Sequence, residues 1–242
     1  MKHKYVLFLT LGGCATSTWH PASDFFYTPI KKTHYEIATW QKNGDNISPI
    51  HIYIEGDGYA FDGRGMPTKN PTPRTTTMRD TAMRDTHLNV AYIARPCQFI
   101  MSEKCTVSDW TDGRFSQHII DDMADTVYNV AKKRPIILVG YSGGALISGL
   151  IIKQHPELNI QKWISIAGVL NHEQWTEYFG DAPLRKSINM TQVPQIKQTH
   201  YIAEKDNVVP HELTKKMVAD TDIVIIKNAT HNKIPVFDIN FN

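Results

Sequence analysis

The chain has 242 residues, of which 41% are hydrophobic and 21% charged, and its formal net charge is +2. A chain of this length and composition forms one domain or two at most, and it is not disordered, collagen-like or coiled-coil. The 26 Lys and Arg residues are nearly balanced by 24 Asp and Glu residues and form no basic block, so nothing favours nucleic-acid binding. No apolar run reaches the roughly 18 residues that a membrane-spanning helix needs.

The start of the chain has the parts of an export signal. A basic start (residues 1–4) is followed by a short apolar run (5–11) and two glycines. The sequence Leu-Gly-Gly-Cys at 11–14 resembles the bacterial lipobox, which implies cleavage before Cys14 and lipid on that cysteine. Ala15, rather than Asp, follows the cysteine, and by the same resemblance this favours the outer membrane of a bacterial cell envelope.

This interpretation divides the chain into three parts. Residues 1–13 are a lipoprotein signal peptide, 14–32 a lipidated N-terminus and tether, and 33–242 the folded domain. More than one acyl chain on Cys14 would anchor the protein stably to a membrane surface. The alternative is that the first residues are an ordinary strand with a buried cysteine.

Strand and helix patterns alternate through the rest of the chain. The expected elements in chain order are a strand at 33–41, a strand at 49–55, a helix at 75–87, a strand at 89–94, a helix at 116–133, a strand at 136–139, a helix at 143–154, strands at 163–167 and 199–203, a helix at 210–219 and a strand at 223–226. Residues 56–74 are rich in Gly, Pro and Thr and are expected to form a long loop. This alternation predicts an α/β fold with a mostly parallel sheet.

The cysteine count agrees with an exported protein. If Cys14 is acylated, Cys97 and Cys105 remain as an even pair, which an oxidising compartment favours. We therefore predict a disulfide between these two; the alternative is two buried thiols in a cytosolic protein. No metal-binding spacing and no phosphate- or dinucleotide-binding loop is present, so we expect neither a metal nor a cofactor.

Residues 140–144, Gly-Tyr-Ser-Gly-Gly, match the G-x-S-x-G pattern. The buried-strand pattern at 136–139 leads directly into it, and the helix pattern at 143–154 leaves it. Strand, tight turn and helix together are typical of a nucleophile elbow, in which the turn exposes a serine beside the positive end of a helix. Ser142 is therefore the candidate nucleophile.

A serine hydroxyl needs a base, and the base needs an acid that orients it. Asp206 follows the expected strand at 199–203, and His231 follows the final strand at 223–226. Because the carboxyl ends of parallel strands lie at one edge of a sheet, we expect Ser142, Asp206 and His231 to meet there. The order Ser, Asp, His is also the order of the fold that carries this elbow.

Each of these residues has a plain alternative. Asp206 could simply cap a helix, and the chain contains 11 histidines. Glu204 is a competing acid. His200 and His211 flank Asp206, but neither follows the final strand.

With these motifs the chain resembles the α/β-hydrolases over residues 33–231. The resemblance implies a mostly parallel central sheet with helices on both faces, and the segment 169–197 is too short for a large cap domain. Residues 52–58 resemble the family's oxyanion loop. Residues 95–99 and 109–114 look like those of a bacterial subgroup of secreted or lipid-anchored hydrolases.

An oxyanion hole needs two backbone N–H donors aimed at the developing negative charge. The resemblance assigns these donors to Gly143 and Asp57. Glu55 stands where the family more usually has a histidine. Because a carboxylate close to an oxyanion would oppose catalysis, we expect the side chains of Glu55 and Asp57 to point away, towards Arg95 or Arg114.

Aromatic residues in the expected edge loops are candidates for the substrate site. Tyr59, Tyr141 and Trp175 are the first choices, with Phe61 and Trp110 beside them. Packing is the plain alternative for both tryptophans.

Together these observations predict an extracytoplasmic, lipid-anchored serine hydrolase. We expect it to cleave small carboxylic esters through an acyl-enzyme. We also expect it to bind a membrane through its N-terminal lipid. The alternatives are a serine peptidase on the same fold and a non-catalytic, envelope-binding lipoprotein.

Overall fold

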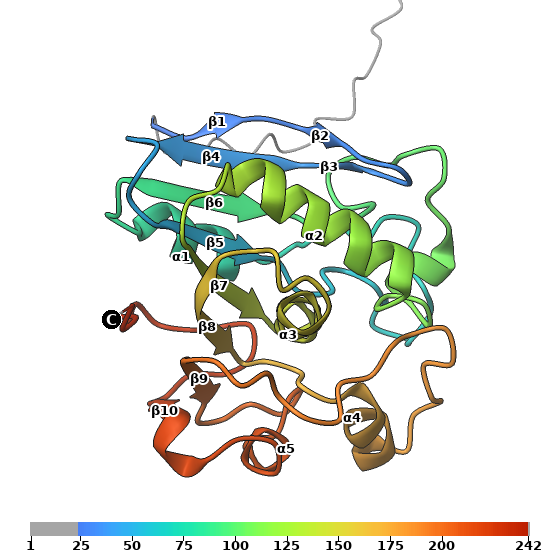
Figure 1. Ribbon diagram of the computed structural model, residues 1–242. Coiled ribbons are helices and arrows are strands. Elements are labelled where there is room, and N and C mark those ends of the chain that lie inside the picture. Colours follow the sequence, from blue (N-terminus) through green and yellow to red (C-terminus); the bar gives the residue numbers. More distant parts are fainter. Residues whose placement is uncertain (1–23, 242) are drawn as a thin grey trace, which may run out of the picture.

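A mostly parallel eight-stranded sheet forms the centre of the computed structural model, which describes residues 24–241 (Figure 1). Its strands lie in the order β1-β4-β6-β5-β7-β8-β9-β10. In chain order their bounds are β1 (Phe26–Tyr27), β4 (Thr39–Asn43), β5 (Ile50–Ile54), β6 (Asn89–Ile93), β7 (Ile136–Tyr141), β8 (Ile160–Ile166), β9 (Gln198–Ala203) and β10 (Ile223–Ile226). All pairs from β6 to β10 are parallel, whereas β1 and β4 are antiparallel to their neighbours. The expected parallel α/β sheet is therefore confirmed.

The first strands differ from the expectation. The single strand expected at 33–41 is two elements, β3 (Glu36–Ile37) and the first part of β4, and β3 pairs with β2 (Ile30–Lys31) in a separate two-stranded sheet. β1 and β2 also lie inside the segment 14–32, for which the sequence predicts a tether, so the folded part of the chain begins before residue 33. Two-residue strands are too short to give a periodic pattern, which is why the sequence did not reveal them.

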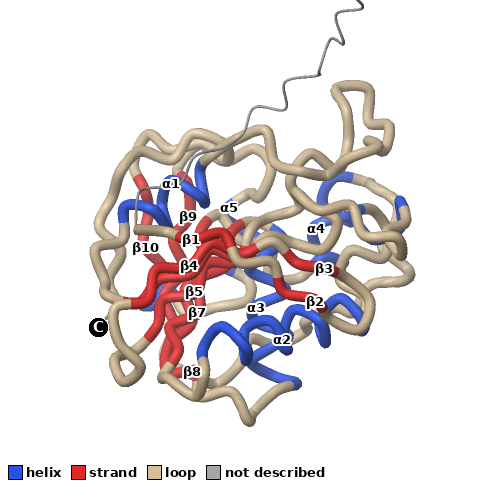
Figure 2. Tube along the Cα trace, turned by 90° about the horizontal axis from the view of Figure 1, so that it is seen from above, coloured by secondary structure: helices blue, strands red, loops and turns tan. Residues whose placement is uncertain are grey.

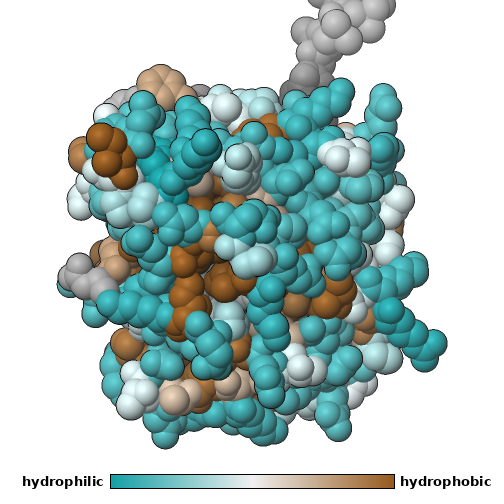
Figure 3. All heavy atoms as spheres, in the orientation of Figure 1, coloured by the Kyte–Doolittle hydropathy of each residue, from teal (hydrophilic) through white to brown (hydrophobic). Residues whose placement is uncertain are grey.

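Helices cover both faces of the sheet. Their bounds are α1 (Thr77–Arg84), α2 (Gln117–Ala131), α3 (Gly143–Gln154), α4 (His172–Phe179) and α5 (His211–Lys215), and two 3₁₀ turns span Val107–Trp110 and Asp220–Asp222. Figure 2 shows α1 on one side of the sheet and α2 and α3 on the other. The outer face of α2 and α3 is mostly hydrophilic, with apolar residues gathered towards its middle (Figure 3). None of the helices within residues 24–241 is long and apolar enough to cross a membrane.

The helix patterns explain this two-sided core. Ile119, Met123 and Val127 recur at helical spacing and place one face of α2 in the larger core cluster, together with α3. β7 lies in the middle of the sheet and is buried on both faces, as its continuous apolar run predicts. The second cluster lies on the α1 face, where the C-terminal segment 234–241 also packs.

The loops at the carboxyl edge of the sheet are short or tied down. The connection from β8 to β9 contains only α4, an unexpected short helix that begins after Asn171, whose side chain accepts a hydrogen bond from the Gln174 N–H. No cap domain is formed within the described residues.

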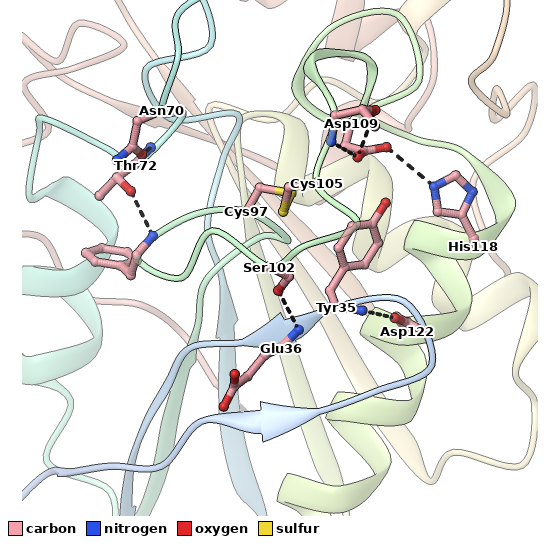
Figure 4. Close-up of a disulfide and its surroundings, with 12 residues drawn as sticks. Tyr35, Glu36, Asn70, Thr72, Cys97, Ser102, Cys105, Asp109, His118 and Asp122 are labelled. Atoms are coloured by element: carbon pink, nitrogen blue, oxygen red, sulfur yellow. Dashed lines mark hydrogen bonds and ion pairs between the residues drawn. A yellow bond between two sulfur atoms is a disulfide. The ribbon is translucent and has the colours of Figure 1, made fainter.

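The loop after β6 is closed by the Cys97–Cys105 disulfide, with a Cα–Cα distance of 5.8 Å (Figure 4). The predicted pairing is confirmed. Hydrogen bonds hold the loop on both sides: Thr72 Oγ1 accepts from the Phe99 N–H at 2.7 Å, and Ser102 Oγ accepts from the Glu36 N–H at 2.9 Å. The disulfide loop is therefore tied both to the 56–74 loop and to β3.

Candidate active site

Ser142 sits in the turn between β7 and α3 with φ +51° and ψ −124°. A residue with a side chain rarely adopts this conformation, and it is held here because the chain must turn sharply from strand to helix. Gly144 has no room for a Cβ, since the carbonyls of Ile54 and Glu55 lie against its Cα. The turn therefore has the strained geometry expected for a nucleophile elbow, and it places the hydroxyl at the N-terminus of α3.

The three candidate catalytic residues lie in hydrogen-bonding contact. His231 Nε2 is 3.0 Å from Ser142 Oγ, and His231 Nδ1 is 2.9 Å from Asp206 Oδ2. Ser142 follows β7, Asp206 follows β9 and His231 follows β10, so three parallel strands each bring one residue to the same edge. The side chains of Asp206 and His231 are 1% and 7% exposed, and water therefore competes little for their hydrogen bond.

Neighbouring groups fix the acid and the base. Asp206 Oδ1 accepts hydrogen bonds from the Val208 and Val209 N–H groups, which leaves Oδ2 for His231. The Tyr141 hydroxyl donates to the His231 carbonyl at 2.7 Å, and the two rings stack at 5.3 Å.

Tyr141 therefore does not have the position expected of a substrate-binding residue. It is 4% exposed and lies beneath the histidine. Burial, followed by the charges of Glu55 and Asp206, raises the pKa of its hydroxyl above the ordinary value, so the group stays protonated and can donate. The sequence pattern could not show this, because a loop tyrosine that faces a ligand looks the same as one that supports a neighbour.

The alternative acid and bases are engaged elsewhere. Glu204 pairs with Lys227 at 2.9 Å and accepts from the Asn228 N–H, which holds it away from the histidine. His200 is buried between Ser165 and Gln198. His211 lies beside Glu212 at the surface. Among these candidates, the geometry brings Asp206 and His231 alone to Ser142.

The two expected oxyanion donors lie next to the serine. Gly143 is the first residue of α3, so its N–H has no partner within the helix. The segment carrying Asp57 passes close by, since a Cβ on Gly56 would lie 3.0 Å from Ser142 Cβ. Within the described residues, no hydrogen-bond acceptor is assigned to the N–H of either Gly143 or Asp57.

The two carboxylates of this loop have different partners. Asp57 lies 3.0 Å from Arg95 Nη1 and 3.2 Å from Arg114 Nε, as expected. Its Oδ1 also lies against Gly143, so the side chain does not turn fully away from the elbow, and the two arginines offset its charge.

Glu55, in contrast, pairs with neither of the expected arginines. It accepts hydrogen bonds from the Tyr92 hydroxyl at 2.7 Å and from the Gly56 N–H at 2.8 Å. Burial raises the pKa of Glu55 above its ordinary value, and these hydrogen bonds oppose the rise. Its side chain is part of the core beneath the loop.

The remaining aromatic candidates lie in two places: Tyr59 and Phe61 are in the loop after β5, and Trp175 is on α4. The Tyr59 ring is covered by the Arg74 guanidinium at 3.4 Å, and Phe61 is 40% exposed. Trp175, on α4, donates to the Val208 carbonyl and lines a cavity of about 10 Å³ that also touches Val169.

Trp110 is 6% exposed and donates to the Thr68 carbonyl. Trp110 therefore packs within the fold, which is the alternative to a role in substrate binding.

Cys14 lies outside the described residues. Within residues 24–241, no group of three or more His, Cys, Asp and Glu side chains could hold a metal ion.

This arrangement can perform nucleophilic chemistry. His231 Nδ1–H is held by Asp206, which leaves the Nε2 lone pair to accept the Ser142 proton. The Gly143 and Asp57 N–H groups lie in segments next to Ser142 and have no assigned acceptor among the described residues, so they are available to stabilise negative charge on an attacked carbonyl.

Several solved structures of serine hydrolases share this architecture. A serine hydrolase without a lid from Xanthomonas campestris has a TM-score of 0.53 and 13% identity, with 87% of each chain covered. An α/β serine hydrolase homologue from Coxiella burnetii has a TM-score of 0.55 and 16% identity, covering 89% of this chain and 92% of that one. The fold is that of the α/β-hydrolases.

The same fold also occurs within larger enzymes. Prolyl oligopeptidase B from Galerina marginata has a TM-score of 0.52 and 15% identity, covering 80% of this chain but 30% of that one. No family model matches the chain, and a search of curated proteins finds no match. At such low identities the likeness establishes the fold alone, and the chemistry must be argued from the site.

Proposed function

We propose that this protein is a serine hydrolase that cleaves carboxylic esters through an acyl-enzyme on Ser142. The observation that carries the proposal is the continuous contact from Ser142 Oγ to His231 Nε2 and from His231 Nδ1 to Asp206, at 3.0 and 2.9 Å. The strained turn at Ser142 supports it, because backbone strain at a single residue is typical of functional sites.

The proposed reaction has two steps. In the first, Ser142 Oγ attacks the ester carbonyl while His231 Nε2 takes the hydroxyl proton, and the Gly143 and Asp57 N–H groups stabilise the oxyanion. His231 then gives the proton to the departing alcohol, leaving an acyl group on Ser142. In the second step His231 takes a proton from water as the water oxygen attacks the acyl carbon. The bond from that carbon to Ser142 Oγ then breaks, His231 returns the proton to Oγ, and the carboxylic acid leaves.

Esters are favoured over amides by the size of the site. An amide nitrogen must be protonated as it leaves, which requires a scissile bond held closely against the histidine. Extended contacts along a peptide usually supply this positioning. Here the connection from β8 to β9 contributes only α4, so little of the described chain can hold a long peptide.

A serine-directed phosphonate probe tests the reaction. We expect the probe to label the wild-type protein at Ser142 and not to label Ser142→Ala. Wild-type protein should also hydrolyse p-nitrophenyl esters of graded acyl length faster than the p-nitroanilides of the same acyl groups. Faster anilide cleavage would favour a peptidase, and absence of labelling would favour a non-catalytic binding protein.

We also propose that the protein works in a bacterial cell envelope, anchored by lipid on Cys14. The basic start, the apolar run and the Leu-Gly-Gly-Cys sequence support this location. The Cys97–Cys105 disulfide is compatible with an oxidising compartment. The intact mass of protein purified from bacterial membranes should correspond to a chain that begins at an acylated Cys14. A mass equal to the full unmodified sequence would contradict the anchor.

A further inference from the structure

The peptide group between Gly56 and Asp57 is the part of the oxyanion loop nearest the elbow. The Asp57 N–H belongs to this group, and so does the Gly56 carbonyl. The Gly56 carbonyl accepts a hydrogen bond from Gln98 Nε2 at 2.9 Å. Gln98 is 1% exposed, so this hydrogen bond is shielded from water.

The hydrogen bond determines where the Asp57 N–H points. In a trans peptide the C=O and N–H bonds are antiparallel and lie in one plane. A donor that holds the Gly56 carbonyl on one side therefore directs the Asp57 N–H to the opposite side. Ser142 lies close to this segment, and no acceptor is assigned to that N–H among the described residues.

Gln98 is itself held in place. Its Oε1 accepts from the Arg95 N–H at 3.0 Å, so both ends of the side-chain amide are used. The residues on either side, Cys97 and Phe99, both have positive φ, at 69° and 64°. Such a conformation persists only where the surroundings impose it. The disulfide at Cys97 is one such restraint (Figure 4).

The side chain of Asp57 is fixed from the same direction. Arg95 and Arg114 each contact one of its carboxylate oxygens, and both arginine side chains are at least 95% buried, with 5% and 4% exposed. Arg95 also donates to the Arg114 carbonyl, which links the two segments. Gly58 leaves the space that Gln98 needs, since a Cβ there would lie 2.7 Å from Gln98 Nε2.

We propose that Gln98 is a positioning residue that aims the Asp57 N–H at the oxyanion. The inference rests on the proposed function. It adds that one of the two oxyanion donors is set by a residue that touches neither substrate nor Ser142. The effect should therefore appear in the transition state and not in substrate binding.

Gln98→Met tests the inference, because Met has a similar volume but cannot donate to the Gly56 carbonyl. The matched control is Thr72→Val, which removes a hydrogen bond from the same disulfide loop without touching the Gly56–Asp57 peptide. With a p-nitrophenyl ester we expect Gln98→Met to lower kcat about 10- to 100-fold, less than the loss of a whole oxyanion donor, with KM unchanged within about twofold. Thr72→Val should retain kcat.

A second variant covers the case in which Gln98→Met does not fold. Gln98→Glu keeps the size and the acceptor for the Arg95 N–H, but its carboxylate has no donor for Gly56. It should show the same loss in kcat. An unchanged kcat in the folded variant, a change in KM alone, or an equal loss in Thr72→Val would overturn the inference.

Amide hydrogen exchange separates this inference from the proposed function. Exchange in residues 56–61 should be faster in Gln98→Met than in wild type and Thr72→Val. If the wild-type protein neither hydrolyses esters nor reacts with the phosphonate, the proposed function fails. Faster exchange in Gln98→Met would then still support its hold on the loop, whereas unchanged exchange would overturn that as well.

Discussion

Two buried His–Asp pairs lie at opposite ends of the same sheet. At the carboxyl edge, His231 Nδ1 is 2.9 Å from Asp206, and at the amino end of β5, His51 Nδ1 is 2.7 Å from Asp85. All four side chains are at most 7% exposed. By distance and burial alone the two pairs cannot be told apart, yet only the first has Ser142 at its second ring nitrogen.

The surroundings of the second pair are those of a structural group. The His51 ring is stacked between His87, at 4.2 Å, and Phe241, at 4.0 Å. Asp85 Oδ2 also accepts from the Tyr53 hydroxyl, so its charge is shared between two donors. The pair has no nucleophile and does not lie at the edge where loops follow parallel strands. A His–Asp pair is therefore not an active site by itself. Its place in the sheet and the group at the second ring nitrogen determine whether it can take part in catalysis.

The largest expected effect comes from the pair at the carboxyl edge. Ser142→Ala and His231→Ala should each lower kcat for ester hydrolysis by about 10⁴-fold or more, and the double variant should lose little beyond either one, because the residues act as a unit. His51→Gln should retain kcat. Multiplying losses in the double variant, or an equal loss in His51→Gln, would remove the distinction between the two pairs.

The sequence could predict the first pair because both residues follow recognisable strand patterns along the chain. Ser142, Asp206 and His231 each follow a strand pattern, and parallel strands bring such loops together. The second pair has no comparable signal: His51 lies within a strand and Asp85 after a helix, so only the tertiary fold shows that they meet. The sequence does not identify Gln98 for the same reason, since its proposed role depends on the Gly56 carbonyl, 42 residues earlier.

The fold was predictable in the same uneven way. The apolar run of β7 and the spacing in α2 define the centre of the sheet and one covering layer. The two-residue strands β1 and β2 and the short helix α4 were missed, because elements of this length are stabilised by their neighbours and carry no period of their own.

The same substitution in the acids of the two pairs should have different effects on kcat. Asp206→Asn keeps one oxygen for the Val208 and Val209 N–H groups but no longer holds the histidine proton, so we expect kcat to fall by about 10³- to 10⁴-fold. Asp85→Asn leaves a buried donor among His51, Tyr53 and the His87 N–H without its acceptor, so the free energy of unfolding should fall by about 1 to 3 kcal/mol while kcat is retained. Urea unfolding and steady-state kinetics on both variants check this, and a shared response in both measurements would contradict it.

A third buried histidine, His200, has no carboxylate partner. It should therefore destabilise the folded protein at low pH. Burial lowers its pKa to about 4. Between that value and an unfolded value of about 6.5 the unfolded chain binds more protons, so stability is fully present above pH 6.5 and is lost as the pH falls to about 4. The loss amounts to about 3 kcal/mol at most.

His200→Gln removes this titration. The free energy of unfolding of the variant, measured by urea between pH 7.5 and 4, should fall less steeply than that of wild type. The control is His211→Gln, which changes an exposed histidine and should follow the wild-type slope. Parallel slopes for all three proteins would show that His200 does not contribute to the pH dependence.

The smallest expected effect concerns Phe241, whose ring covers the His51–Asp85 pair at the amino end of the strands. Phe241 stacks on His51 with an interplanar angle of 22°, and the adjacent Asn240 is held by the Tyr201 hydroxyl and by Lys162. Phe241→Ala removes the stacking and part of the apolar cover, which should lower the free energy of unfolding by about 1 to 2 kcal/mol. Val236→Ala, at a position that is 74% exposed in the same segment, should change the free energy of unfolding by less than about 0.5 kcal/mol.

Because His51 lies at the end of the strands opposite Ser142, kcat should be the same in Phe241→Ala and Val236→Ala. A loss of kcat in Phe241→Ala at temperatures where it is folded would mean that the two ends of the sheet are coupled, and the amino-end pair would then have a part in catalysis after all.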